Sequence, residues 1–220
     1  MHVRNSYPIL FASLVFMSSP VCGQAHQSDL EQAKQLLREG HADQSLALID
    51  PIISRAMSEE AKDPAAICPS EAVAVLQGFM KGGFKISIEN DWCDALLLKG
   101  YALNELKRPT EAAQTLEILV GHAPNNAQYL TEYAYAVRVN GDPERALSVY
   151  KRAETASSKL PDRASIAHWR AVALRGQGYS YTDLERWDDA TKAYRNSLKY
   201  EPKNEIAQHE LRYIDEHRPH

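Results

Sequence analysis

The sequence predicts an all-α protein, and within that class an α-solenoid made of stacked antiparallel helix pairs. Two small residues twelve positions apart recur three times: Gly100 and Ala112, Ala134 and Ala146, Gly178 and Ala190. Two antiparallel helices that are joined by a short turn approach closely only where neither carries a bulky side chain. Apolar residues around each pair follow helical spacing. Each segment is therefore predicted to form two helices that cross at the small residues.

The predicted helix pairs recur at a nearly constant distance along the chain. Units that begin at Cys93 and Ala127 are 127 minus 93, or 34, residues apart, and the next unit begins at Ala171, which is 44 residues after Ala127. The second step equals the first plus ten inserted residues. The sequence thus predicts three units within residues 93–204, and their ranges are 93–126, 127–160 and 171–204.

The apolar positions keep the same register in the three units, at Leu96, Leu130 and Leu174, then Leu103, Val137 and Tyr181, then Leu116, Tyr150 and Tyr194. Pro124 and Pro202 close the first and third units. Proline lacks an N–H and has a fixed φ, so it stops the second helix and turns the chain toward the next unit.

The segment from Cys93 to Asn204 resembles three tandem tetratricopeptide repeats, which have a period of about 34 residues. The third unit matches best, through Leu174, Gly178, Tyr181, Ala190, Tyr194, Ser197 and Pro202. The chain departs from the family pattern in having leucine where an aromatic residue stands near the start of the first helix. The resemblance implies a superhelix whose first helices line a concave groove.

Residues 26–59 are predicted to form a weaker helix pair of the same kind. Ala33 stands at the crossing, Gly40 stands in the turn, and Ser45 replaces the second small alanine. Asp29 occupies the position at which the other units have leucine. A terminal repeat faces a neighbour on one side only, so an atypical sequence is expected there.

Residues 205–220 are predicted to form a capping helix and a tail. Asn204 is a suitable N-cap, and the apolar residues that follow, up to His217, lie on one helical face at spacings of four and three. The same pattern fits the first helix of a truncated repeat.

Residues 1–25 have the pattern of a secretory signal peptide. Arg4 precedes an apolar run at 9–17, and small residues that suit cleavage follow near Gly23 and Ala25. Removal of this segment takes away one arginine and no acid, so the formal charge changes from -4 to -5. The sequence therefore predicts an exported protein that is periplasmic or secreted.

Two alternatives to signal cleavage are weaker. A retained membrane anchor conflicts with the length of the apolar run at 9–17, which has nine residues, because a spanning helix needs roughly 20. A lipoprotein attached through Cys22 would require small residues before that cysteine, and Pro20 and Val21 fit this requirement poorly. We therefore expect no stable membrane span.

Cleavage would leave two cysteines, Cys68 and Cys93, which are 93 minus 68, or 25, residues apart. Disulfides persist in oxidising compartments, so the sequence favours a bridge that would add on the order of 3 kcal/mol in the chain-entropy model. Two separate buried thiols are the alternative. No CxxC spacing indicates redox exchange or a zinc site.

Residues 60–92 form an insert between the first two helix pairs. A helix is predicted at 70–81, and alternating apolar residues at 84–88 predict a short extended segment. The favoured interpretation is an enlarged connection that buries its aromatic residues, including Trp92. A binding element is the alternative.

A tyrosine follows the small crossing residue in each of the three strong repeats. The resemblance implies that this position faces the groove, where an aromatic ring with a polar tip suits an interface. The predicted partner groove is lined by Tyr101, Asn104, Tyr135, Arg138, Arg175 and Tyr179. In the alternative interpretation the three tyrosines fill the wedge between neighbouring repeats.

The usual catalytic and metal-binding patterns are missing from the sequence. Gly178-Tyr179-Ser180 lacks the closing glycine of a nucleophile elbow because Thr182 stands there. The eight histidines include no HExxH pair. We therefore expect no catalytic residue, no metal and no cofactor. A negative net charge without a Lys/Arg stripe also argues against nucleic-acid binding.

These observations predict an exported, non-catalytic adaptor that binds a protein or peptide in its groove, within an assembly of the cell envelope. The repeats that clamp the carboxylate of a chaperone tail are disfavoured, because tyrosine stands where such a clamp needs asparagine. The alternative is an accessory subunit of a catalytic apparatus, or an enzyme whose site lies in residues 60–92.

Overall fold

The computed structural model describes residues 22–60, 68 and 90–218, and every regular element in these residues is an α-helix. This confirms the predicted all-α solenoid. The apolar run at 9–17, the predicted helix at 70–81 and the predicted extended segment at 84–88 lie outside the described residues.

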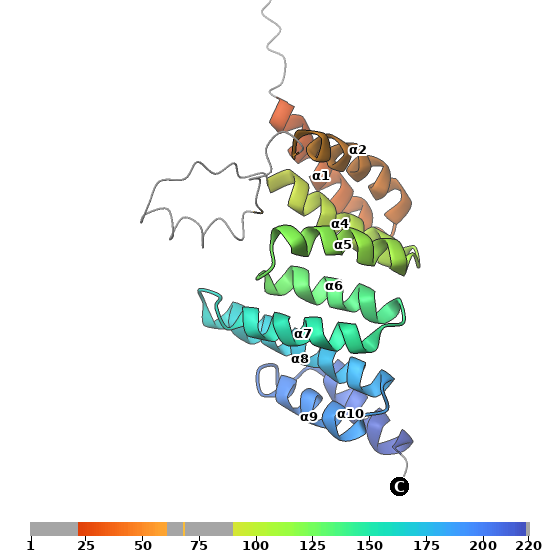
Figure 1. Ribbon diagram of the computed structural model, residues 1–220, viewed down its shortest axis with the longest axis vertical. Helices are drawn as coiled ribbons and strands as arrows, with labels where there is room; N and C mark the ends of the chain where they lie inside the picture. The colour runs from red at the N-terminus through yellow and green to blue at the C-terminus, as the bar shows by residue number, and fades with distance from the viewer. Residues whose placement is uncertain (1–21, 61–67, 69–89, 219–220) are drawn as a thin grey trace, which may run out of the picture.

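The helices form consecutive antiparallel pairs that stack along the long axis of the molecule (Figure 1). The pairs are α1 (Cys22–Arg38) with α2 (Ala42–Glu60), α4 (Asn90–Glu105) with α5 (Pro109–His122), α6 (Ala127–Val139) with α7 (Pro143–Ser157), and α8 (Arg163–Asp183) with α9 (Trp187–Leu198), followed by α10 (Glu205–His217). The first helices also contact one another in order, α1 with α4, α4 with α6 and α6 with α8. We call the surface formed by α1, α4, α6 and α8 the first-helix face.

The small residues lie where the two helices of a pair cross. A Cβ atom added to Gly100 would lie 2.6 Å from Cγ of Leu116, and one added to Gly178 would lie 2.6 Å from Cζ of Tyr194. Neither distance leaves room for a side chain. The remaining small residues at the crossings, Ala112, Ala134, Ala146 and Ala190, are fully buried.

Each of the four helix pairs turns through a residue with a left-handed backbone, at Gly40, Lys107, Gly141 and Glu185. In each turn the next residue donates its N–H to a carbonyl five positions earlier, as His41 does to Leu36 at 2.8 Å and Arg186 does to Tyr181 at 2.8 Å. These bonds satisfy carbonyls that the helix end would leave free. The N-terminal pair therefore has the same turn as the three strong repeats.

Three helix starts differ from the predicted boundaries. Helix α4 begins at Asn90, three residues before the predicted start of its unit at Cys93. Helix α8 begins at Arg163 instead of Ala171, because Asp162 caps it by accepting a hydrogen bond from the Ser165 N–H at 2.8 Å. The inserted residues thus extend the first helix of the third unit. Helix α1 begins at Cys22, before the predicted start of the mature chain.

A disulfide joins Cys68 to Cys93 at the start of α4, with a Cα–Cα distance of 5.7 Å. Both cysteines are fully buried. Trp92, next to the bridge, belongs to α4 and packs edge-on against His122 of α5, with 4.3 Å between the ring centroids. Cys68 is thereby held against the first strong repeat.

The buried apolar residues form two clusters. The larger runs from Leu30 in α1 to Ala173 in α8. The smaller lies at the C-terminal end, where Ala207 and Ile214 of α10 pack against Tyr194 of α9. Asn204 caps α10 by accepting a hydrogen bond from the Ala207 N–H at 3.0 Å. Helix α10 therefore covers the apolar end of the stack.

Candidate functional site

A pocket of about 530 Å³ opens on the first-helix face between α1, α4 and α6. Its lining residues are Lys34, Leu37 and Arg38 from α1, Leu98, Tyr101, Asn104 and Glu105 from α4, Lys107 from the following turn, and Glu132 and Tyr135 from α6. Because the three helices that build it are the first helices of their pairs, the pocket follows directly from the stacking. We call it the α1–α4–α6 pocket.

Tyr101 and Glu132 contact each other in this pocket. The Tyr101 hydroxyl accepts a hydrogen bond from Gln128 Nε2 at 3.4 Å and donates one to the Glu132 carboxylate. Burial raises the pKa of Glu132 from its usual 4.5 to about 7, and the Tyr101 hydrogen bond opposes this only in part. In the described part of the chain no lysine or arginine acts on the pKa of Glu132. The carboxyl group is thus partly removed from water, with no cation of the described residues to offset this.

Asn104 brings a second acceptor to the same pocket. Its Oδ1 atom is buried and has no hydrogen-bond partner among residues 22–60, 68 and 90–218. Buried polar atoms are normally paired, so this oxygen lacks the donor that its burial calls for. Asn104 and Glu132 together give the interior of the pocket an acceptor character.

Tyr135 stands at the edge of the pocket, and 43% of its surface is exposed. The Arg138 guanidinium lies over its ring at 5.9 Å and over the Tyr179 ring at 5.0 Å. Arg138 Nη1 also donates a hydrogen bond to Asp183 Oδ2 at 2.8 Å. Arg138 therefore joins Tyr135 to Tyr179 and is itself held by α8.

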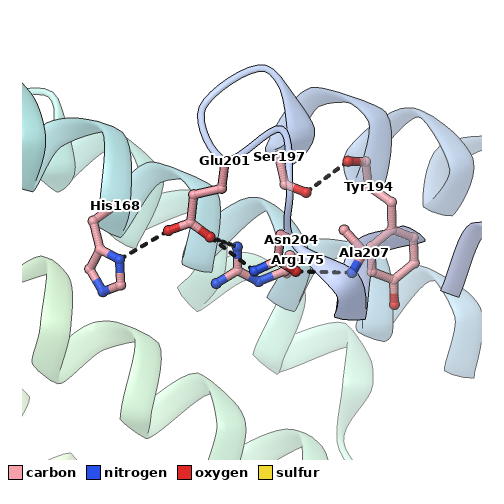
Figure 2. A network of polar contacts seen from close by, with 7 residues as sticks. All are labelled: His168, Arg175, Tyr194, Ser197, Glu201, Asn204 and Ala207. Atoms are coloured by element: carbon pink, nitrogen blue, oxygen red, sulfur yellow. Dashed lines mark hydrogen bonds and ion pairs between the residues drawn. The ribbon is translucent and has the colours of Figure 1, made fainter. Parts of the chain in front are cut away.

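Arg175 lies in a separate network at the other end of the first-helix face (Figure 2). It forms an ion pair with Glu201, in the turn between α9 and α10, and only 13% of its side chain is exposed. The same carboxylate accepts a hydrogen bond from Asn204 Nδ2 at 3.1 Å and lies 3.0 Å from His168 Nδ1. Tyr179 packs edge-on against Tyr194, with 5.7 Å between the centroids. This end of the face is closed by the chain's own groups.

The structure thus divides the six predicted groove residues. Tyr101, Asn104 and Tyr135 line the α1–α4–α6 pocket, whereas Arg138, Arg175 and Tyr179 lie outside it. Sequence reasoning missed Glu132, although it stands three residues before Tyr135 and therefore shares its helical face.

The described helices give no sign of two other kinds of site. They contain no group of three or more His, Cys, Asp or Glu side chains that could hold a metal ion. None of them is long and apolar enough to cross a membrane.

Residues 97–161, which include the helices that form most of this pocket, match the sequence model described as Tetratricopeptide repeat. This segment is thus similar in sequence to tetratricopeptide repeats. Among curated proteins, none matches the chain in sequence.

Solved structures of repeat proteins share the fold. MamA from Desulfovibrio magneticus RS-1 is 13% identical with a TM-score of 0.57, and the match covers 89% of this chain and 86% of that one. The nearly identical TPR-like repeats of a Podosopora anserina kinesin light chain candidate are 15% identical with a TM-score of 0.61, over 91% and 88% of the two chains. At these identities the likeness concerns the fold alone.

Proposed function

We propose that this protein is an exported, non-catalytic adaptor that binds a segment of a protein partner on its first-helix face, within an assembly of the cell envelope. The observation that carries the proposal is the α1–α4–α6 pocket, where the half-exposed ring of Tyr135 stands beside acceptors that the chain leaves open. Exposed aromatic rings with a polar tip are typical anchors of protein interfaces.

Two features support export. Residues 1–25 have the pattern of a signal peptide. The Cys68–Cys93 disulfide supports the same location, since such bonds are rare where thiols are kept reduced. An extracytoplasmic partner follows from these two observations.

The non-catalytic assignment rests on the chemistry of the pocket. A perturbed carboxyl such as Glu132 is a common mark of an active site, but the pocket lining offers no serine, cysteine or histidine for it to activate. A catalytic site in residues 60–92 would lie almost wholly outside the described residues, and nothing in the described helices favours it.

Tyr135→Ala tests the proposal. The purified chain would be used as bait against the exported fraction of its native cells, and Tyr135→Ala should lose the partner that the wild-type chain retains. Tyr213→Ala is the matched control, since Tyr213 has 38% of its surface exposed but lies on α10, outside the α1–α4–α6 pocket. Both variants should keep their far-UV circular dichroism and melt within a few degrees of wild type.

Two results would contradict the proposal. One is recovery of the same partner by Tyr135→Ala at wild-type yield. The other is substrate turnover by the purified chain alone, which would turn the assignment toward an enzyme.

A further inference from the structure

We infer that the α1–α4–α6 pocket receives a basic side chain, a lysine or an arginine, from the bound partner, with Glu132 and Asn104 as its acceptors and the Tyr135 ring against its cationic head. The inference rests on the proposed adaptor function and names the partner chemistry that this pocket selects.

The first argument is the excess of acceptors inside the pocket. Asn104 Oδ1 is buried without a donor among the described residues. The Glu132 carboxylate receives one hydrogen bond, from Tyr101, although a carboxylate can accept several. A lysine ammonium brings three donors and an arginine guanidinium five. A basic side chain therefore has enough donors for Glu132, and for Asn104 Oδ1 once that amide turns toward the pocket.

The second argument is charge. Glu132 is the partly buried carboxyl of the pocket, and burial without a neighbouring cation raises its pKa to about 7. A cation from a partner would stabilise the ionised form. An acidic side chain would instead place two carboxyl groups together, which disfavours the ionised state of both.

The basic residues at the rim do not reverse this preference. Lys34 is paired with Glu31 at 2.8 Å and with Asp94 at 3.7 Å. Arg38 donates two hydrogen bonds to the neutral Gln35, and because its side chain is exposed, water screens its charge. Lys107 belongs to the exposed turn after α4, where water screens its charge.

The third argument is the aromatic edge. A guanidinium or ammonium group is attracted to the face of an aromatic ring within about 6 Å. The chain already uses this contact on the same surface, because Arg138 lies over both Tyr135 and Tyr179. Tyr135 still has 43% of its surface exposed. A basic side chain that enters the pocket can use that remaining surface.

Synthetic peptide pools provide the test. Four pools of nonapeptides would have arginine, lysine, leucine or glutamate fixed at the centre and random residues elsewhere, and each would be titrated against the purified chain by fluorescence anisotropy. We expect the arginine and lysine pools to bind about tenfold or more tightly than the other two, as charge-assisted hydrogen bonds at a partly buried site imply.

Three variants assign the preference to the pocket. Glu132→Gln should remove most of it, and Asn104→Leu should weaken binding of the basic pools while keeping the side-chain volume similar. Glu105→Gln is the charge-matched control, since Glu105 is exposed at the rim of the same pocket, and it should change affinity by less than about threefold. Circular dichroism of each variant checks that it is folded.

Binding that is tightest for the leucine or glutamate pool overturns the inference, and so does equal binding, or no binding, of all four pools. The adaptor proposal survives any of these results if Tyr135→Ala still loses the exported partner. If Glu105→Gln acts as strongly as Glu132→Gln, the preference reflects the general field of the surface, and the assignment to the pocket is wrong.

Discussion

The two ends of the first-helix face shift the pKa of a partly buried glutamate in opposite directions. In the α1–α4–α6 pocket, burial raises the pKa of Glu132 to about 7, and no cation of the described chain offsets it. At the C-terminal end burial also acts on Glu201, but the hydrogen bond and charge of Arg175 outweigh it and hold the pKa of Glu201 below its usual 4.5. The same face thus has an open acceptor site at one end and a closed ion pair at the other.

The difference follows from the position of each end in the stack. The pocket lies between three consecutive first helices, and its walls are fixed by packing on both sides. At the C-terminal end of the described helices, α10 is held by the small apolar cluster and by the network around Glu201 (Figure 2). One stack of helices therefore carries a site suited to binding in one place and a stabilising network in another.

The largest expected effect concerns the contact between α7 and α8, which lies between the two ends of the stack. A Cβ atom at Gly176 of α8 would overlap the ring of Tyr150 of α7, which is buried and has no room to move away. We expect Gly176→Ala to lower the free energy of unfolding by about 3 kcal/mol, because overpacking in a tight core forces side chains and backbone to shift. Chemical denaturation measures this loss of free energy.

Gly121→Ala is the control for the intrinsic preference of helices for alanine. Gly121 is exposed in α5, and a Cβ atom there would meet nothing within 4 Å. We therefore expect Gly121→Ala to raise the free energy of unfolding by up to about 1 kcal/mol. Equal stabilities of the two variants would mean that α7 and α8 are not packed as tightly as the structure has them.

The next effect concerns the network around Glu201. Arg175→Ala leaves a partly buried carboxylate without its cation, and we expect a loss of about 2 kcal/mol, less than for a fully buried pair. Hydrogen exchange should quicken mainly in α10. Arg186→Ala breaks an exposed ion pair with Asp189 and should cost no more than about 0.5 kcal/mol. If Arg175→Ala lost peptide binding while its stability stayed unchanged, Arg175 would be a groove residue, as the sequence predicted.

The fold was largely predictable because its signals are local. Close helix crossings require small residues, so the spacing of Gly100, Ala134 and Gly178 revealed the stacked pairs before any coordinates. Gly176 carries an equally strict constraint, but its partner, Tyr150, belongs to the preceding unit and falls outside the repeat pattern. Helix α8 begins eight residues before the predicted unit start at Ala171, because ten inserted residues in a repeat protein look the same in sequence whether they form a loop or lengthen a helix.

The site was less predictable because its electrostatics are not local. Arg175 stands four residues before Tyr179, and this spacing suggested a shared groove, yet its carboxylate partner Glu201 lies 26 residues further along the chain. Glu132 resembles any solvated glutamate on a helix. Its burial depends on how α1 and α4 pack beside α6, which no feature near Glu132 reveals.

The smallest effect, and the sharpest test of the comparison, concerns Glu132. Its folded-state pKa of about 7 is above the usual 4.5, so between these values the folded chain binds more protons than the unfolded chain. The contribution of protonated Glu132 to the free energy of unfolding is fully present below about pH 4.5 and is lost as the pH rises through about 7. A dry site would make the loss about 3 kcal/mol, and water in the open pocket should reduce it to about 1 kcal/mol.

Glu132→Gln should therefore match wild type near pH 4.5 and exceed its free energy of unfolding at pH 8 by about 1 kcal/mol. Glu105→Gln, with its side chain exposed at the rim, should follow the wild-type curve at every pH. Urea denaturation across this range gives both curves. A Glu132→Gln variant that is less stable than wild type at pH 8 would mean that the ionised carboxylate already has a favourable partner within the chain. The contrast with Glu201 would then disappear, and the pocket would no longer be left with an acceptor that a basic side chain of another protein could satisfy.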